Sequence, residues 1–175
     1  MKDRYVVDTN VLIAATAAHH TTMRVIDATP VDVELRNVIK DWLVEFESGD
    51  VRMLVDSDLK IFDEYNGALN HNDYGRQVVL SKFSTAAVDF LEIEYDENGD
   101  GVLSQALSDV VHDRADRKMV ATALEAHTQF GEGCIAFASD TDWHEWEAKL
   151  LEHSVLLEPI IEEWSRQKHA EKQAR

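Results

Sequence analysis

The sequence has few of the features that secreted and membrane-spanning proteins need. Its single cysteine, Cys134, excludes an internal disulfide framework and any zinc cluster built on cysteine, and it suits a reducing compartment. No segment approaches the roughly 20 consecutive apolar residues that cross a bilayer, and the N-terminus lacks the pattern of a signal peptide. We therefore expect a soluble protein with no membrane partner and with the cytoplasm as its default compartment.

Basic residues are also scarce. The 17 lysines and arginines face 34 aspartates and glutamates, which leaves a formal net charge of -17. This charge excludes polybasic binding that neutralises phosphates broadly, but it leaves open a local basic site or a metal ion that bridges to phosphate. With only 2 prolines and 7 glycines in 175 residues, nothing marks a linker, so we expect one domain over residues 1–175.

Apolar runs typical of strands alternate along the chain with segments that carry helical stripes. The sequence predicts strands at 5–7, 51–55, 90–95, 134–138 and 155–157. It predicts helices at 10–18, 30–48, 58–70, 77–83, 113–130, 141–153 and 158–173, the second with a stripe of Val33, Val38, Trp42, Leu43 and Phe46. This alternation indicates an α/β protein with three layers, in which a mostly parallel central sheet lies between helices and a C-terminal helix begins at about residue 158.

Acidic residues follow two of the predicted strands directly. Asp8 comes after the first strand and Asp140 after the strand that ends near residue 138. The carboxyl ends of parallel strands share one edge of a sheet, where ligands of such folds bind. Glu64 in the helix after the second strand and Asp116 in the first turn of the helix 113–130 can reach the same edge. The topology thus predicts one acidic pocket.

Carboxylates that lie together repel one another unless they are protonated or neutralised by a hard cation. Mg²⁺ and Mn²⁺ prefer such oxygen ligands and keep waters and substrate phosphate in their remaining positions. An ion held in this way lowers the pKa of a bound water and offsets charge on a departing oxygen, which is the chemistry of phosphodiester hydrolysis. The pocket therefore predicts a Mg²⁺ or Mn²⁺ site.

Each of these acids also has an ordinary structural explanation. Asp8 and Asp140 can cap the helices that follow them, and Asp116 suits a helix N-terminus because of the helix dipole. Glu64 alone is typical of a solvated helix surface. Only the joint pattern favours a functional site.

Four segments carry a resemblance to a known family. They read YVVDTNVL at 5–12, LKIFDEY at 59–65, DRADRKMVA at 113–121 and ASDTD at 138–142. In this order they resemble the four acidic motifs of the PIN-domain family, whose members are mostly metal-dependent ribonucleases and include many toxins of toxin-antitoxin pairs. The resemblance implies a PIN-like nuclease fold, Mg²⁺ or Mn²⁺ as cofactor, and RNA, or single-stranded DNA, as substrate. It also implies an antitoxin or other basic protein as a candidate partner, and a homodimer.

Carried over residue by residue, the resemblance assigns the metal site and catalysis to Asp8, Glu64, Asp116 and Asp140. Asp142 is a fifth candidate ligand. Asp113 competes with Asp116 because the two are expected three residues apart on one helical face, and the sequence after Asp116 matches the family better. Residues expected around the metal or the substrate are Thr9, Asn10, Asp113, Ser139, Arg114, Arg117 and Lys118.

Two features depart from the simplest members of the family. Segments 21–49 and 90–111 look like insertions relative to a minimal version of the family's fold, suited to a lid, a dimer surface or a partner site. The second departure is the net negative charge of the protein, which repels the phosphates of a nucleic acid. Binding of a nucleic acid would require Arg114, Arg117 and Lys118, which flank Asp116, to lie at the pocket. Pairing with helix carboxylates is the alternative role for these three cations.

Two further signals favour structural roles. Residues 96–101, DENGDG, match the first half of an EF-hand loop, but position 12 is Leu107 where a glutamate is required, so a plain turn is favoured over calcium binding. Trp143 and Trp146, three residues apart, are expected to pack a helix on the sheet rather than to stack on bases.

The sequence thus favours a divalent-metal-dependent endonuclease. The alternative from another class is a catalytically silent PIN-like binding module that recruits a basic partner through its acidic surface. A phosphatase acting on small phosphoesters shares the metal chemistry and is separated from the nuclease by its substrates.

Overall fold

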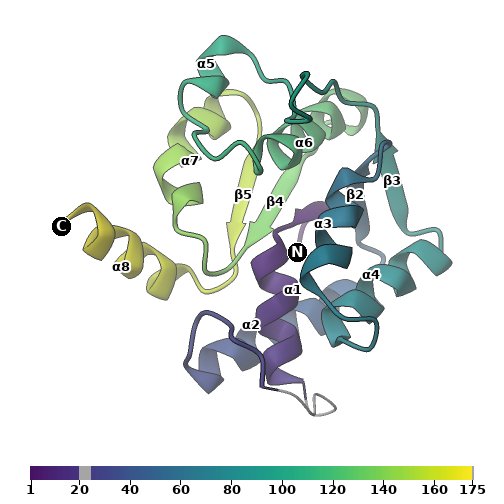
Figure 1. The fold of residues 1–175 in the computed structure, drawn as a ribbon, viewed down its shortest axis with the longest axis vertical. Coiled ribbons are helices and arrows are strands. Elements are labelled where there is room, and N and C mark those ends of the chain that lie inside the picture. The colour runs from purple at the N-terminus through teal and green to yellow at the C-terminus, as the bar shows by residue number, and fades with distance from the viewer. Residues whose placement is uncertain (20–24, 175) are drawn as a thin grey trace.

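The computed structural model describes residues 1–19 and 25–174. Its parallel sheet has the strand order β3-β2-β1-β4-β5 (Figure 1). The strands are β1 (Arg4–Val7), β2 (Arg52–Asp56), β3 (Val88–Leu91), β4 (Cys134–Phe137) and β5 (Leu156–Pro159). The helices are α1 (Thr9–Ala18), α2 (Val33–Ser48), α3 (Lys60–Ala68), α4 (Tyr74–Ser84), α5 (Gln105–Ser108), α6 (Arg117–Phe130), α7 (Asp142–Glu152) and α8 (Glu162–Gln173).

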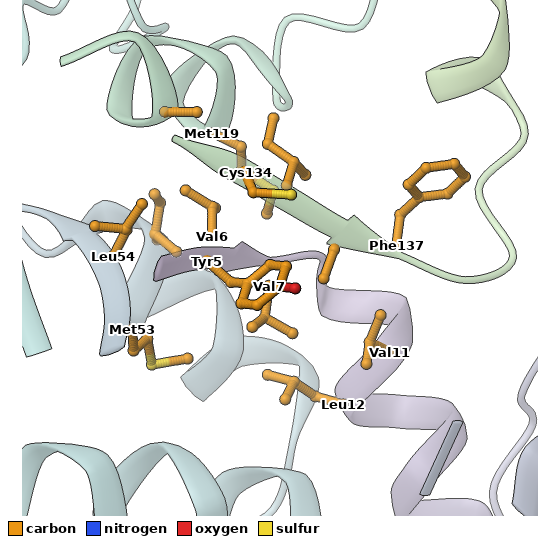
Figure 2. Close-up of a cluster of buried hydrophobic side chains, with 14 of the residues drawn as sticks. Tyr5, Val6, Val7, Val11, Leu12, Met53, Leu54, Met119, Cys134 and Phe137 are labelled. Atoms are coloured by element: carbon orange, nitrogen blue, oxygen red, sulfur yellow. The ribbon is translucent and has the colours of Figure 1, made fainter. Parts of the chain in front are cut away.

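Helices cover both faces of the sheet, which confirms the predicted three-layer α/β/α class. Helices α1, α2 and α4 pack together on one face, whereas α6 crosses the other face and contacts β1 to β4 (Figure 1). The central strands are short apolar runs with almost no exposed surface, because both faces are covered. Figure 2 shows this core, in which Tyr5, Val6 and Val7 lie among side chains of neighbouring elements.

The structure corrects the predicted start of the second helix. Pro30 does not open it: α2 begins at Val33, and the Asp32 carboxylate caps it by accepting hydrogen bonds from the Glu34 and Leu35 N–H groups. Val33 and Val38, expected on the buried stripe, are 65% and 49% exposed. Leu43 and Phe46 of the predicted stripe are buried, together with Ile39, and Trp42 packs on this core while partly exposed. In the segment 21–49, residues 21–24 lie outside the described part of the chain.

Three other predicted boundaries of helices and strands also differ from those in the structure. The helix expected from residue 58 begins at Lys60, and the buried Asp56 carboxylate accepts the N–H groups of Lys60 and Ile61. The strand expected over 90–95 is β3, which ends at Leu91. The C-terminal helix begins at Glu162 rather than near residue 158, because Glu158 belongs to β5.

The helix expected from residue 113 begins at Arg117 instead. Asp113 and Asp116 therefore do not share a helical face: Asp113 lies in an exposed turn, and Asp116 is the N-cap of α6. Within the part of the chain that the structure describes, no helix is both long enough and apolar enough to cross a membrane.

The order of the strands fixes the position of the candidate site. β1 lies between β2 and β4, and its register pairs Val7 with Ala136. The residues that follow β1 and β4 consequently emerge side by side at the carboxyl edge, and the N-termini of α1 and α7 point there.

Candidate metal centre

Asp8 is the most buried acid of the site. It joins β1 to α1, its N–H donates to the Ala136 carbonyl of β4 at 2.9 Å, and the residue is only 3% exposed. Its Oδ1 accepts the Asn10 N–H at 2.7 Å, so Asp8 is also the N-cap of α1. Asp8 therefore caps α1 and also belongs to the cluster of aspartates described below.

Asp116 and Asp140 come from the opposite helical layer and the neighbouring strand. Asp140 follows β4, and its Oδ1 accepts the Asp142 N–H at 3.0 Å, which holds the turn into α7. Asp116 adopts helical backbone angles as the N-cap of α6 and forms no side-chain capping bond. Its carboxylate therefore does not serve to satisfy the α6 N–H groups.

The three aspartates form a compact cluster. One carboxylate oxygen from each of Asp8, Asp116 and Asp140 lies within 4.8 Å of the other two. An octahedral ion with oxygen ligands at about 2.1 Å places those ligands about 3.0 to 4.2 Å apart, depending on their angle. The three oxygens thus lie close enough together to bind a metal ion, and the cluster offers it oxygen ligands.

Burial and mutual repulsion disfavour the charged forms of these carboxyls. Burial, followed by the charges of Asp140 and Glu64, raises the pKa of Asp8 to about 6, although hydrogen bonds from Trp143 and the Asn10 N–H act in the opposite direction. Burial and then the charges of Asp8 and Asp140 raise the pKa of Asp116 to about 9. The pKa of Asp140 is also raised, chiefly by burial. A cation bound here would reverse these shifts.

Glu64 lies beside the triad but has other partners. The Thr9 hydroxyl donates to its Oε1, and the Lys118 ammonium is 2.6 Å from its Oε2. Glu64 still contributes to the raised pKa of both Asp8 and Asp116 through its charge. The predicted neighbourhood of Thr9, Lys118 and the acids is therefore present in the structure, with Glu64 held at its edge.

The remaining predicted residues occupy the periphery. Asp142 begins α7 and pairs with the Lys172 ammonium of α8. Asp113 is exposed and accepts the Ala115 N–H at 2.8 Å, but its charge contributes to the raised pKa of both Asp116 and Asp140. Ser139 is half-buried on the turn between β4 and Asp140.

Two cations expected near substrate have partners elsewhere. The Arg117 guanidinium donates to the Val111 and Ser108 carbonyls at 3.1 and 3.0 Å, so it fastens the segment before α6 rather than facing the cluster. Arg114 pairs with Asp96 and Asp100 of the preceding turn. Arg114 is thus ion-paired, but with loop carboxylates and not with the helix carboxylates that the alternative role named.

The segment 96–101 forms the predicted turn. The Asp96 Oδ1 accepts the Asn98 and Asp100 N–H groups at 2.8 and 3.0 Å, and Tyr95 forms a bridge with Gly101. A Cβ on Gly101 would lie 2.7 Å from the Lys118 main chain, so this turn packs directly on the first turn of α6. The turn thus supports the helix that carries Asp116.

Trp143 is a site residue that sequence reasoning missed. Its packing role is confirmed, because Trp143 and Trp146 are buried against each other with ring centroids 5.3 Å apart. Its indole N–H, however, also donates to Asp8 Oδ2 at 2.8 Å. Both Asp8 oxygens are therefore oriented by donors. The two partners are 135 positions apart in the sequence, so no local signal predicted this bond.

Comparison of the chain with family models, curated proteins and solved structures found no match in any of the three.

Proposed function

We propose that this protein is a divalent-metal-dependent endonuclease that hydrolyses phosphodiester bonds, with RNA as its favoured substrate. The observation that carries the proposal is the cluster of Asp8, Asp116 and Asp140 at the carboxyl edge of a parallel sheet. Stabilisation alone gives no reason to bring three such carboxyls together, because their burial and repulsion disfavour ionisation. The resemblance of four motifs to the PIN-domain family supports nuclease chemistry and RNA over other phosphoesters.

The protein's own residues would hold and orient the reacting groups. Asp8, Asp116 and Asp140 would hold the ion, with Asp8 fixed by Trp143 and the Asn10 N–H and Asp140 by the Asp142 N–H. A bound Mg²⁺ or Mn²⁺ supplies a water of lowered pKa and positive charge near the departing oxygen. The buried setting of Asp8 keeps bulk water from one side of the centre, which strengthens these electrostatic interactions.

Cleavage of labelled nucleic acids tests this function. Structured RNA, single-stranded RNA and single-stranded DNA would be incubated with Mg²⁺, Mn²⁺ or EDTA and either wild type or Asp116→Asn. Asp63→Asn is the matched control, because it makes the same change of carboxyl to amide on the exposed side of α3. We expect metal-dependent cleavage of RNA that Asp116→Asn lowers at least about 100-fold, since even residues outside the first coordination sphere often cost 10 to 100-fold. Cleavage that survives Asp116→Asn would refute the proposed centre.

A second candidate function is favoured by the charge distribution. The net charge of -17 and the pairing of Arg114, Lys118 and Lys172 with carboxylates leave an acidic surface suited to a basic partner, such as an antitoxin. A binding module of this kind would bind a Lys- and Arg-rich peptide in a salt-sensitive way and would cut none of the nucleic acids. Turnover of a small aryl phosphate without nucleic-acid cleavage would instead indicate the phosphatase.

A further inference from the structure

Lys118 places a positive charge inside the candidate centre. Its Nζ lies 2.6 Å from Glu64 Oε2 and donates to the Ala115 carbonyl, also at 2.6 Å. The side chain is only 12% exposed, unlike most surface lysines. The ammonium therefore bridges α3 and the segment before α6 as part of the folded structure.

The other Glu64 oxygen is engaged as well. Thr9, the first residue of α1, donates its hydroxyl proton to Oε1. Glu64 is consequently held between the N-terminus of α1 and that of α6, with a hydroxyl on one oxygen and an ammonium on the other. A metal ion approaching Glu64 would therefore meet a carboxylate whose two oxygens already accept a hydroxyl and an ammonium.

A cation near Glu64 would also meet repulsion. An ion coordinated by Glu64 would stand within a few ångströms of the Lys118 ammonium, and like charges at that separation repel strongly where solvent is limited. The triad of Asp8, Asp116 and Asp140 has oxygens near enough to one another to share an ion without Glu64. The four predicted ligands therefore fall into two groups. Asp8, Asp116 and Asp140 can share an ion, whereas Glu64 is already paired with Lys118.

We propose that Lys118 is a built-in counter-cation for Glu64, so that the centre holds one divalent ion on Asp8, Asp116 and Asp140 and Glu64 is not a ligand. The inference rests on the proposed metal centre and departs from the four-carboxylate set that the PIN resemblance implies. It assigns the Glu64–Lys118 pair the role of balancing charge beside the ion without contacting the ion.

Titration of the full-length protein with Mn²⁺, with free Mn²⁺ measured by electron paramagnetic resonance, tests this arrangement. The wild type should bind one ion. The decisive variant combines Glu64→Gln with Lys118→Met, because it removes the pair without changing the net charge. It should still bind one ion, with a Kd within about threefold of wild type, whereas loss of a ligand should weaken binding by at least about tenfold.

Single substitutions give the complementary result. Lys118→Met frees a Glu64 oxygen and removes the repulsive charge, so Mn²⁺ should bind at least about tenfold more tightly or a second ion should enter. Lys149→Met is the matched control, because it removes the same charge from an exposed pair on α7. Lys118→Arg, which keeps the charge, should still bind one ion.

Three outcomes are distinguishable. Two ions on the wild type, or loss of the ion in the double variant while urea unfolding shows it folded, would overturn the inference and leave the metal centre standing. No Mn²⁺ on the wild type would remove the metal centre itself, and this inference with it. One ion on both the wild type and the double variant supports it.

Discussion

Replacing Asp116 by asparagine should stabilise the metal-free protein while destroying its metal site. Burial, followed by the charges of Asp8, Asp140, Asp113 and Glu64, raises the pKa of the Asp116 carboxyl to about 9 from an ordinary value of 3.8. The amide keeps the shape of the side chain but cannot acquire the unfavourable charge. The variant should therefore be less sensitive than wild type to rising pH.

The sign follows from proton counting. Between about pH 4 and pH 9 the folded protein keeps a proton on Asp116 that the unfolded chain releases, so the folded state binds more protons. The free energy of unfolding consequently falls as pH rises through this window. One proton difference corresponds to about 1.4 kcal/mol per pH unit, or about 3 kcal/mol between pH 6 and pH 8. Asp116→Asn should abolish that part of the decline.

Urea unfolding in EDTA at pH 6, 7 and 8, followed by tryptophan fluorescence, measures the difference. A gain of about 3 kcal/mol corresponds to a midpoint shift of about 1 to 2 M at an m-value of about 2 kcal/mol/M. Asp63→Asn on the exposed side of α3 controls for the change in net charge. If Asp116→Asn gains no more than Asp63→Asn, or the gain does not grow with pH, the carboxylates are not coupled and the reasoning fails.

Three further predictions concern the same centre. Mg²⁺ or Mn²⁺ at ten times its Kd should stabilise wild type by about 1.4 kcal/mol, which raises Tm by about 3 to 6 °C in a scan; an equal rise in Asp116→Asn would contradict this. Trp143→Phe removes the hydrogen-bond donor to Asp8, so it should lower the free energy of unfolding by about 1 to 3 kcal/mol and weaken Mn²⁺ binding. An unchanged affinity for Mn²⁺ would show that this hydrogen bond does not orient Asp8. Gly101→Ala forces the turn against the Lys118 main chain, so it should lower the free energy of unfolding measured in urea by about 1 to 3 kcal/mol. Gly67→Ala, at an open position in α3, should raise it by up to about 1 kcal/mol. Equal effects of the two substitutions would mean that the turn does not brace α6.

The parallel sheet was predictable because its central strands leave a strong local signal. Segments such as Tyr5–Val7 and Cys134–Ala138 are short apolar runs between helical patterns, and burial on both faces of a sheet requires that composition. The positions of Asp8 and Asp140 then follow from topology alone, since each lies in the short connection that follows one of two neighbouring parallel strands.

The start of α6 could not be predicted from local sequence. Asp113 is a reasonable helix start by composition, but Arg117 and Arg114 bind the carbonyls and carboxylates of the preceding segment and fix residues 113–116 as a turn. These contacts join residues brought together only in the folded chain. The helix therefore begins where tertiary bonds allow it, and the expected shared face of Asp113 and Asp116 does not exist.

The partners of the individual acids were hidden for the same reason. The Glu64–Lys118 pair and the Asp8–Trp143 bond join residues far apart in the sequence. A motif identifies an acidic residue at a strand end or on a helix, but it does not say whether that carboxylate forms an ion pair, as Glu64 does with Lys118, or accepts an indole hydrogen bond, as Asp8 does from Trp143. The chemistry of each carboxylate is decided by these non-local partners.

An acidic body need not prevent binding of a phosphodiester, because charge acts over a limited range. At an ionic strength of 0.15 M the Debye length is about 8 Å, so most of the net charge of -17 is screened from a phosphate at the centre. The local balance decides instead: the triad and Glu64 on one side, and Lys118, Lys172 near Asp142 and a divalent ion on the other. Without the ion this balance is acidic and repels phosphate. The proposed enzyme should therefore bind metal before nucleic acid, and EDTA should abolish RNA binding as well as cleavage.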